Sequence, residues 1–252
     1  MMIDESVNYE KVLTEPKQLV AVELKKQGFD INKISMPQTV FLLADDIFDK
    51  MKDLNCGKYQ YPVSNGVWIF NHNSEVGFVK AEMCSPAIAT QAEDLIATGV
   101  KELIHIGYAG GLQESLQVGD IVITEGAFND TAIARLYGYD TDFMETSKEL
   151  TDKIKYMITG VDLSVIKGKS WTTDAGYHET LRQVLEYRKK SALCVEMEGV
   201  GLFTIAKYRN CKATALYIVS DVFSKDEWQL GWDGEVIAQS VDFILKQIVK
   251  AI

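Results

Sequence analysis

The segment ALCVEMEGVGLFTIAKYRNCKATALYIVSD, residues 192–221, decides the fold of this chain. Its first apolar run, 192–195, has the length of a short buried strand. Residues 199–209 carry apolar side chains at helical spacing, and 213–219 form a second and longer apolar run. A strand, a helix and another strand in this order are typical of an α/β sheet that is covered by helices on both faces.

The same alternation continues on both sides of this segment. Helices are predicted from apolar spacing and charge at 18–28, 85–99, 145–158, 179–190 and 235–252. Strands are predicted at 39–44, 102–106 and 120–123, and a hairpin at 67–70 and 76–79. Ser85 is expected to cap its helix, with Pro86 at the first helical position. We therefore expect an α/β fold, a single domain over 1–252 with three layers. A mixed central sheet is flanked by helices, and residues 1–36 form a peripheral lead-in.

The composition is that of a folded and acidic protein. The chain has 252 residues, of which 47% are hydrophobic, and its formal net charge is −10. Disordered chains lack this apolar content. The negative charge argues against nucleic acid as a partner and against attachment to an anionic membrane, because both need a basic surface. It does not exclude an anionic substrate, since a few local donors can hold a phosphate group.

Signals for export and for metal binding are missing from the sequence. The first 18 residues are polar and acidic, without the basic start and apolar region of a secretory signal. No stretch approaches the roughly 20 apolar residues of a membrane span. Four cysteines without a CxxC pair, and only three histidines, argue against a structural zinc site. We expect a cytoplasmic protein with reduced cysteines, in which Cys84 and Cys194 are buried thiols.

A glycine-rich segment, Gly107-Tyr108-Ala109-Gly110-Gly111, follows the strand predicted at 102–106. Glycines at the end of a strand permit close approach of the backbone to a ligand, often a phosphate. Dinucleotide-binding and P-loop motifs open directly into a helix, whereas this segment leads into another predicted strand. From its residues alone, the segment is either a loop that cradles a ligand or a tight structural turn.

Carboxylates stand at the ends of both strands of the opening segment. Glu196-Met197-Glu198 follows the first strand, at the position where open α/β sheets place their ligands. Two neighbouring carboxylates suit a sugar diol, because each accepts hydrogen bonds from hydroxyls. The alternative is that they stabilise the N-terminus of the next helix. Asp221 follows the second strand and is a candidate proton donor or, alternatively, an N-cap.

A third polar cluster, WTTDAGYHE at 171–179, precedes a predicted helix. Asp174 is a candidate N-cap for that helix, and Tyr177 is a candidate surface residue. By themselves, these two residues do not indicate a reaction.

Taken together, the segments resemble the nucleoside phosphorylase superfamily, which includes purine nucleoside phosphorylases, uridine phosphorylases and related nucleosidases. The matching segments are ELIHIGYAGGLQESLQVGDIVI (102–123), WTTDAGYHET (171–180) and CVEMEGVGLFTIAKYRNCKATALYIVSD (194–221). The resemblance implies a phosphorylase/hydrolase-like fold and an oligomer built on dimers, either a homodimer or a homohexamer. It also implies cleavage of an N-glycosidic bond, in which phosphate attacks C1′ and yields a free base and a pentose 1-phosphate.

The resemblance implies roles for individual residues as well. Glu198, together with Met197 and Glu196, would bind the ribose hydroxyls. Asp221 would act as the catalytic acid that protonates or hydrogen-bonds the leaving base, which favours a purine. Tyr177 would lie beside the base. No metal and no organic cofactor is implied, and phosphate is the expected co-substrate.

The phosphate site departs from the family pattern. Asp45 and Asp46 stand where the family usually carries a Gly-Asp-Pro-x-Arg-like turn, and His105 stands where it carries a second arginine. Tyr108 replaces the hydroxyl-bearing threonine that follows Gly107. By position, Asp45, His105, Gly107 and Tyr108 remain the residues of the phosphate and glycine-rich loop. Each missing arginine is worth about 1.5–3 kcal/mol in hydrogen bonding, so phosphate binding is expected to weaken.

Other positions bear on the missing cations and on the base. Arg135, Lys169 or a basic residue of a neighbouring subunit is a candidate replacement for the arginines. Gly176 stands where many members place a base-stacking phenylalanine. His178 and Glu179 replace the amide and arginine pair of the uridine-type members, which leaves the base open and inclines it toward a purine.

Three functions follow from these residues. The first is a nucleoside phosphorylase with an altered phosphate site. The second is a nucleosidase, in which water replaces phosphate and Asp46 or Asp49 helps to activate it. The third is a non-catalytic protein that binds or senses a nucleoside. The predominance of phosphorylases in the family favours the first.

Overall fold

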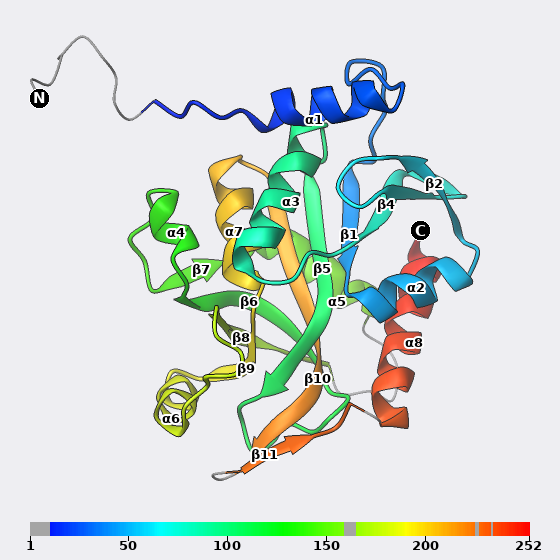
Figure 1. Cartoon of the computed structure of the whole chain (residues 1–252). Coiled ribbons are helices and arrows are strands. Elements are labelled where there is room, and N and C mark those ends of the chain that lie inside the picture. Colours follow the sequence, from blue (N-terminus) through cyan, green and yellow to red (C-terminus); the bar gives the residue numbers. More distant parts are fainter. Residues whose placement is uncertain (1–10, 159–164, 225–226, 233) are drawn as a thin grey trace, which may run out of the picture.

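Two parallel strands, β5 (Glu102–Gly111) and β10 (Lys212–Ser224), lie side by side at the centre of the fold (Figure 1). The computed structural model describes residues 11–158, 165–224, 227–232 and 234–252. The apolar residues in the first half of both strands are buried, as expected for strands that are covered on both faces.

The other strands complete one mixed sheet. They are β1 (Thr39–Leu43), β2 (Gly57–Tyr61), β3 (Val67–Phe70), β4 (Asn73–Lys80), β6 (Ile121–Asp130), β7 (Phe143–Glu145), β8 (Val165–Thr173), β9 (Ala192–Glu196) and β11 (Glu227–Leu230). Their order is β11-β10-β6-β8-β9-β5-β1-β4-β3-β2, with β7 paired to β6. Because β10 also pairs with β5, the strands from β10 to β5 close into a ring, and the others extend from it as an open sheet. The mixed sheet and the antiparallel hairpin of β3 and β4 were both predicted, and both are confirmed.

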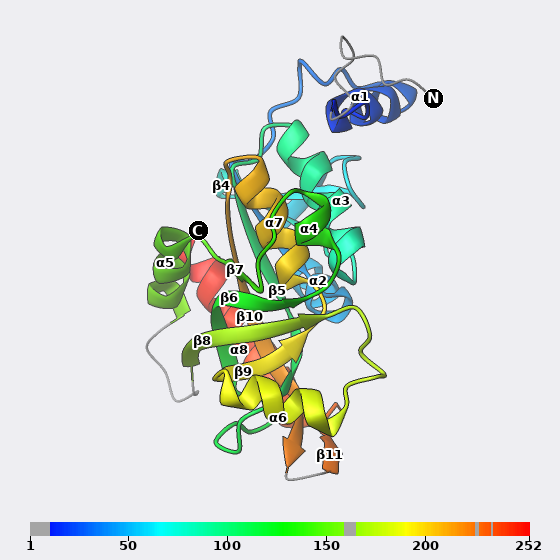
Figure 2. The ribbon, with the colours of Figure 1, turned by 90° about the vertical axis from the view of Figure 1, so that its left-hand side faces the viewer.

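Helices cover the sheet on both faces (Figures 1 and 2). They are α1 (Pro16–Lys26), α2 (Asp45–Asp53), α3 (Ser85–Ala97), α4 (Ile133–Leu136), α5 (Lys148–Ile158), α6 (Leu181–Lys189), α7 (Gly199–Tyr208) and α8 (Glu235–Ala251). Apolar side chains of α1, α3 and α7 form one core with the sheet. Those of α2, α5 and α8 form a second core with it. The predicted three-layer α/β fold is therefore confirmed.

The N-terminal helix α1 lies at the edge of the molecule, against α3 (Figure 1). It buries Val20 and Leu24 and leaves Leu19 and Val22 exposed. This helix belongs to the segment 1–36 that was predicted as a peripheral lead-in, of which residues 1–10 lie outside the described part of the chain.

The glycine-rich segment forms neither a loop nor a turn, so both sequence-based interpretations of its backbone were wrong. Strand β5 continues to Gly111, and Gly110 pairs with Val195 of β9 while also pairing with β10. A Cβ atom at Gly110 would lie 2.9 Å from the Asp221 carboxylate, and one at Gly107 would lie 2.6 Å from the His105 ring. The glycines therefore make room for neighbouring side chains within the sheet.

Two helix starts also differ from the prediction. Cys84, with a φ of 74°, occupies the N-cap position of α3, and Ser85 is its first helical residue. The Ser85 hydroxyl donates to the Met197 carbonyl at 3.1 Å, so tertiary contact takes the group that was expected to cap the helix. At α6, Thr180 and Gln183 form a capping box, which removes the capping role that was suggested for Asp174.

The helix α2 was not predicted, and its position matters for the site. Ile47, Phe48 and Met51 are buried at helical spacing, while Asp45 and Asp46 lie in the first turn. Acidic residues there favour a helix, because they interact with the partial positive charge of its N-terminus. Strands β2, β7, β8 and β11 were also not predicted, and β7 moves the start of α5 from residue 145 to Lys148.

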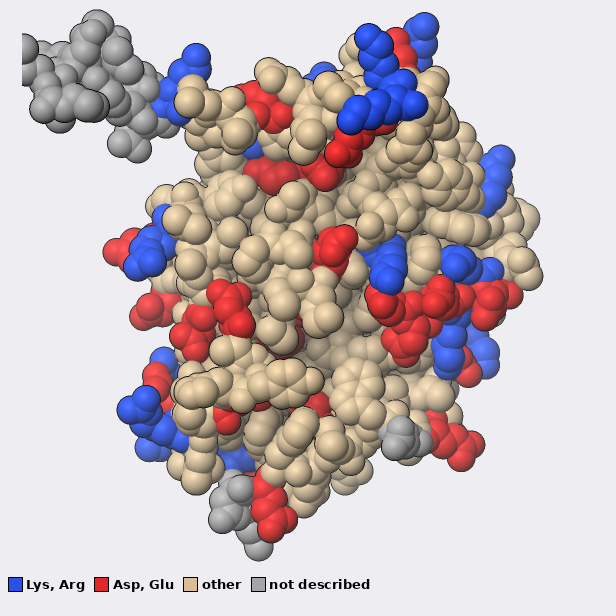
Figure 3. All heavy atoms as spheres, in the orientation of Figure 1, with Lys and Arg blue, Asp and Glu red and all other residues tan. Residues whose placement is uncertain are grey.

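The surface agrees with the acidic composition. On the face drawn in Figure 3, red and blue groups are interspersed, and red groups predominate around its centre. Within the described residues, no helix has the length and apolarity that a membrane crossing requires. All four cysteines are free, with Cys194 buried and Cys84 half-buried.

Candidate active site

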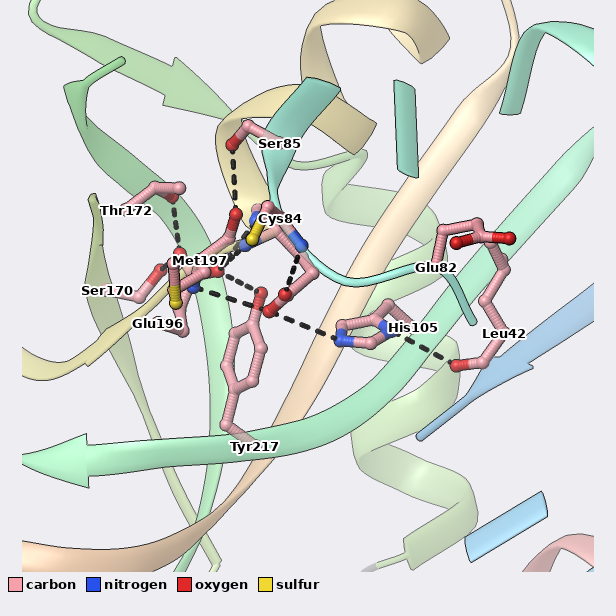
Figure 4. A network of polar contacts seen from close by, with 12 residues as sticks. Leu42, Glu82, Cys84, Ser85, His105, Ser170, Thr172, Glu196, Met197 and Tyr217 are labelled. Carbon is pink, nitrogen blue, oxygen red and sulfur yellow. Dashed lines mark hydrogen bonds and ion pairs between the residues drawn. The ribbon is translucent and has the colours of Figure 1, made fainter. Parts of the chain in front are cut away.

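Glu196 ends β9 inside the protein, where five donors surround its carboxylate (Figure 4). The hydroxyls of Ser170 and Thr172 donate to Oε1. Oε2 accepts from the Tyr217 hydroxyl at 2.9 Å and from the backbone N–H groups of Glu198 and Gly199 at 2.8 and 2.6 Å. A carboxylate offers about four lone-pair sites, so this one has no capacity left for a ligand. Glu196 therefore holds the end of β9 and the start of α7 together.

Glu198 lies two residues further on and is the carboxyl group with unused capacity. Its Oε1 accepts a hydrogen bond from the Cys84 N–H at 2.8 Å, and Oε2 accepts one from the Met197 N–H at 3.3 Å. Only 9% of the residue is exposed. Burial, followed by the charge of Glu196, raises the pKa of Glu198 to about 7. A buried carboxyl group with free lone pairs fits the role of an acceptor for sugar hydroxyls.

His105 lies beside Glu198 and is drawn in the network of Figure 4. Its Nδ1 donates to the Leu42 carbonyl at 3.1 Å, and its Nε2 lies 3.9 Å from Oε2 of Glu198. Burial lowers the pKa of the His105 imidazole to about 4. A neutral ring gives phosphate no positive charge, so His105 does not replace an arginine here.

Asp221 is held at a bulge of β10, also mostly buried. The Ser220 hydroxyl donates to its Oδ1 at 2.6 Å, and the Trp228 indole donates to its Oδ2 at the same distance. The negative charge of Asp221 contributes, after burial, to raising the pKa of Glu179 to about 7. Asp221 and Glu179 are thus two interacting carboxyl groups, a combination that suits proton transfer.

The segment before α6 approaches the carboxylate cluster at one point. A Cβ atom at Gly176 would lie 3.0 Å from the sulfur of the half-buried Met197, so the two are in contact. The next residue, Tyr177, is fully exposed, with a relative accessibility of 102%. The Tyr177 ring therefore does not pack on Glu196, Met197 or Glu198, although Tyr177 directly follows Gly176, which contacts Met197.

Asp45 and Tyr108, two of the residues predicted for the phosphate site, form contacts around the start of α2, where Asp46 also lies. The Tyr108 hydroxyl donates to Asp46 at the start of α2, and the Lys80 ammonium pairs with Asp45 at 3.0 Å. The Tyr108 ring also packs against Trp232 at 4.8 Å. Burial and the contact with Asp46 raise the pKa of Tyr108. These groups are mainly acceptors and anions, which do not complement a phosphate dianion.

Arg135 and Lys169, the two basic residues suggested as replacements for the arginines, form none of the contacts described above for Asp45, Asp46 and Tyr108. Arg135 is exposed on α4. Lys169 lies over the rings of Phe128 and Phe143, at 5.7 and 5.5 Å from their centroids. Within the described residues, no group of three or more histidine, cysteine, aspartate or glutamate side chains could hold a metal ion.

Sequence reasoning missed the residues that hold the cluster in place. Ser170 and Thr172 of β8 and Tyr217 of β10 support Glu196, and Cys84 supports Glu198 through its backbone. The spacing of Ser170 and Thr172 was a signal for this support, since residues two apart in a strand point to the same face of the sheet. The positive φ of Cys84 left no signal in the sequence.

Two cavities on the surface do not include these carboxylates. One, of about 490 Å³, is lined by residues 113, 114, 116–118, 222–224 and 229. The other, of about 810 Å³, lies between α5 and the end of α8. The buried network is the candidate site because its carboxyl groups and their donors form a specific arrangement, whereas these cavities are open to solvent.

Comparisons with known proteins identify the family of the chain. The family model of the Phosphorylase superfamily matches residues 35–250. The DeoD-type purine nucleoside phosphorylase of Brevibacillus brevis is 32% identical over 138 residues, which cover 54% of this chain and 59% of that protein. The DeoD-type enzyme of Caldanaerobacter subterraneus subsp. tengcongensis is 35% identical over 142 residues, 54% of this chain and 60% of its own.

A solved structure gives the corresponding result for the fold. The uridine phosphorylase of Vibrio fischeri ES114 superposes with a TM-score of 0.71 at 17% identity, and the match covers 88% of this chain and 95% of that one. The chain thus matches about three fifths of the length of the curated relatives and nearly the full length of a solved relative. A mixed α/β sheet with buried carboxylates at its strand ends and a family match over residues 35–250 together lead to one conclusion: the chain belongs to the phosphorylase superfamily.

Proposed function

We propose that this chain cleaves the N-glycosidic bond of a nucleoside, with phosphate as co-substrate, and releases a free base and a pentose 1-phosphate. The observation that carries the proposal is the buried Glu198 carboxyl group, which keeps lone pairs free at the end of β9. The names of the curated relatives, both purine nucleoside phosphorylases, support the reaction and incline the base toward a purine.

The roles of the residues follow from their surroundings. Glu198 accepts hydrogen bonds from the sugar hydroxyls, and Met197 lines the sugar next to it. Glu196 acts through its hydrogen bonds to the start of α7, which fix the backbone of Glu198. Asp221 donates a proton or a hydrogen bond to the leaving base, with Glu179 as its neighbour. Such a site stabilises the positive sugar and the departing base of an oxocarbenium-like transition state.

Tyr177 remains our candidate for a contact with the base. Its full exposure means that this contact requires the loop before α6 to fold inward or a neighbouring subunit to cover it. We also propose an oligomer built on dimers, a homodimer or a homohexamer. Light scattering of the purified chain tests the oligomer directly.

A second candidate is a nucleosidase, in which water replaces phosphate. The specific observation in its favour is the acidic start of α2, where Asp46 receives the Tyr108 hydroxyl and Asp45 pairs with Lys80. An anion at this position repels phosphate and can accept a proton from water. Asp49 is a weaker candidate for that base because it pairs with Lys52 at 3.0 Å.

One assay separates these functions. The purified chain is incubated with a panel of purine and pyrimidine nucleosides, with and without phosphate, and base release is followed. Release that rises with phosphate, together with formation of pentose 1-phosphate, supports the phosphorylase. Release that is independent of phosphate contradicts it and identifies a nucleosidase. Nucleoside binding without release of any base identifies the non-catalytic protein.

A further inference from the structure

The Nε2 atom of His105 is buried and has no hydrogen-bond partner among the described residues. A buried polar group without a hydrogen bond is less stable than one that is hydrogen-bonded. The atom faces Oε2 of Glu198 at 3.9 Å (Figure 4). The distance is too long for a hydrogen bond and short enough for a small rotation of the carboxyl group to close it.

The other ring nitrogen fixes the state of Nε2. The Leu42 carbonyl can only accept, so Nδ1 of His105 must carry the proton of the 3.1 Å contact. In the neutral ring, Nε2 is therefore an acceptor. An ionised Glu198 is also an acceptor, so these two atoms can bond only if a proton lies between them.

We propose that His105 and Glu198 share one proton, and that His105 is a positioning residue that sets the charge and orientation of the carboxyl group assigned to the sugar. The proton lies either on Oε2, which then donates to Nε2, or on Nε2, which then donates to Oε2. Both forms give Nε2 its missing partner. The link to the sugar rests on the proposed function, whereas the sharing of the proton does not.

The surroundings of the pair favour this arrangement. From β9, Glu196 adds a negative charge, and from β10 the Tyr217 hydroxyl is directed to Glu196. The half-buried Cys84 thiol approaches from the start of α3. Among the described residues, Glu198 has an ion-pair contact with His105, and no lysine or arginine forms an ion pair with Glu198. Without a local cation, a proton is the charge that can neutralise this carboxyl group.

The backbone of β5 leaves room for the ring. A Cβ atom at Gly107 would lie 2.6 Å from Nε2 and 3.1 Å from the neighbouring ring carbon of His105. The glycine therefore permits the imidazole to fold back along its own strand toward Glu198. This gives Gly107 a role in placing His105, in addition to any direct contact with a ligand.

The shared proton also has a use in the reaction. When a sugar hydroxyl donates to Glu198 and the sugar gains positive character, the proton can move from Oε2 to Nε2. The carboxylate next to the sugar then carries the full negative charge, and no other bond changes. A charge that increases as the transition state forms stabilises that state more than the ground state.

Nitrogen NMR of the full chain labelled with ¹⁵N-histidine tests the sharing without any substrate. We expect Nδ1 to stay protonated throughout, and the Nε2 signal to move from that of a free acceptor toward that of a bonded nitrogen as the pH falls through about 7. In Glu198→Gln the amide donates to Nε2 at every pH, so this transition should vanish. His105→Gln assigns the signal among the three histidines. A free-acceptor signal from acid to alkaline pH, or the same transition in Glu198→Gln, overturns the proposal.

Kinetics test the positioning role. In His105→Gln, the amide can donate to the Glu198 carboxylate and favour its ionised form. Because the proposed reaction uses the form that holds the shared proton, the alkaline limb of kcat/KM, along which this proton is lost, should move to lower pH by about one unit. The exposed His72→Gln is the matched control and should keep the wild-type profile. A reduced activity with an unshifted profile contradicts the role. If wild type releases no base, the proposed function fails, and the NMR measurement still decides the sharing.

Discussion

The indole of Trp228 donates a hydrogen bond to Oδ2 of Asp221 over 2.6 Å, across the antiparallel pair of β11 and β10. Ser220 holds the other carboxylate oxygen at the same distance. Both oxygens of the expected acid are thus oriented before a substrate arrives. One of these donors comes from a strand with no clear pattern in the sequence.

Asp221→Asn tests the acid role. The amide can still accept from Trp228, so the fold should persist, but it cannot donate a carboxyl proton. For a purine nucleoside we expect kcat to fall about 10²–10⁴-fold, whereas the nucleoside dissociation constant changes little. Turnover assays and calorimetric titration measure the two quantities. The exposed Asp140→Asn is the control. Full activity in Asp221→Asn shows that the role is wrongly assigned.

Tyr217→Phe tests the network around Glu196. The variant removes one of five donors to a buried carboxylate, which leaves that charge less well satisfied. We expect the free energy of unfolding to fall by about 1–3 kcal/mol in urea denaturation at pH 7. Tyr156→Phe is the matched control, because that side chain is 87% exposed. Equal stability of the two variants contradicts the supporting role of Tyr217.

The raised pKa of Glu198 predicts a pH dependence of stability. The folded-state pKa of about 7 lies above the ordinary value of 4.5, so between these values the folded state binds more protons. Stability from this group is therefore present below pH 4.5 and is lost as the pH rises through 7. Glu198→Gln should be more stable than wild type at pH 8, on the order of 1–3 kcal/mol, and nearly inactive.

The control for this experiment is Glu145→Gln, a substitution of an exposed glutamate at the end of β7. Denaturation curves of the three proteins at pH 5 and pH 8 give the comparison. If Glu198→Gln loses stability equally at both pH values, the carboxyl group is not protonated in the folded protein at pH 5.

Asp46→Asn tests the nucleophile. If phosphate binds near the start of α2, removal of one negative charge should lower the KM for phosphate about 5-fold, which corresponds to about 1 kcal/mol. If water is the nucleophile and Asp46 accepts its proton, the same variant should lose most of its base release. Initial rates at varied phosphate concentration distinguish the two results. Asp53→Asn, at the exposed end of α2, is the control and should alter neither quantity.

Much of the fold was predictable because the pattern of apolar residues indicates which positions are buried. The apolar runs within β1, β5, β9 and β10 indicated buried strands, and the apolar spacing in α3, α7 and α8 indicated helices. Short or exposed elements escaped prediction. Strand β11 has four exposed residues, so its pairing with β10 depends on backbone hydrogen bonds rather than on an apolar pattern.

The candidate site was likewise predictable only in part. The sequence by itself determined that Glu196, Glu198 and Asp221 follow directly on apolar runs, where ligand-binding groups of α/β sheets often stand. It did not show that β10 continues past Asp221 to Ser224. The tertiary structure decided their different states. Glu196 is saturated by donors from β8, β10 and α7, whereas Glu198 is left facing His105. Hydrogen-bond partners distant in the chain set the charge of a buried group, and only folding brings them together.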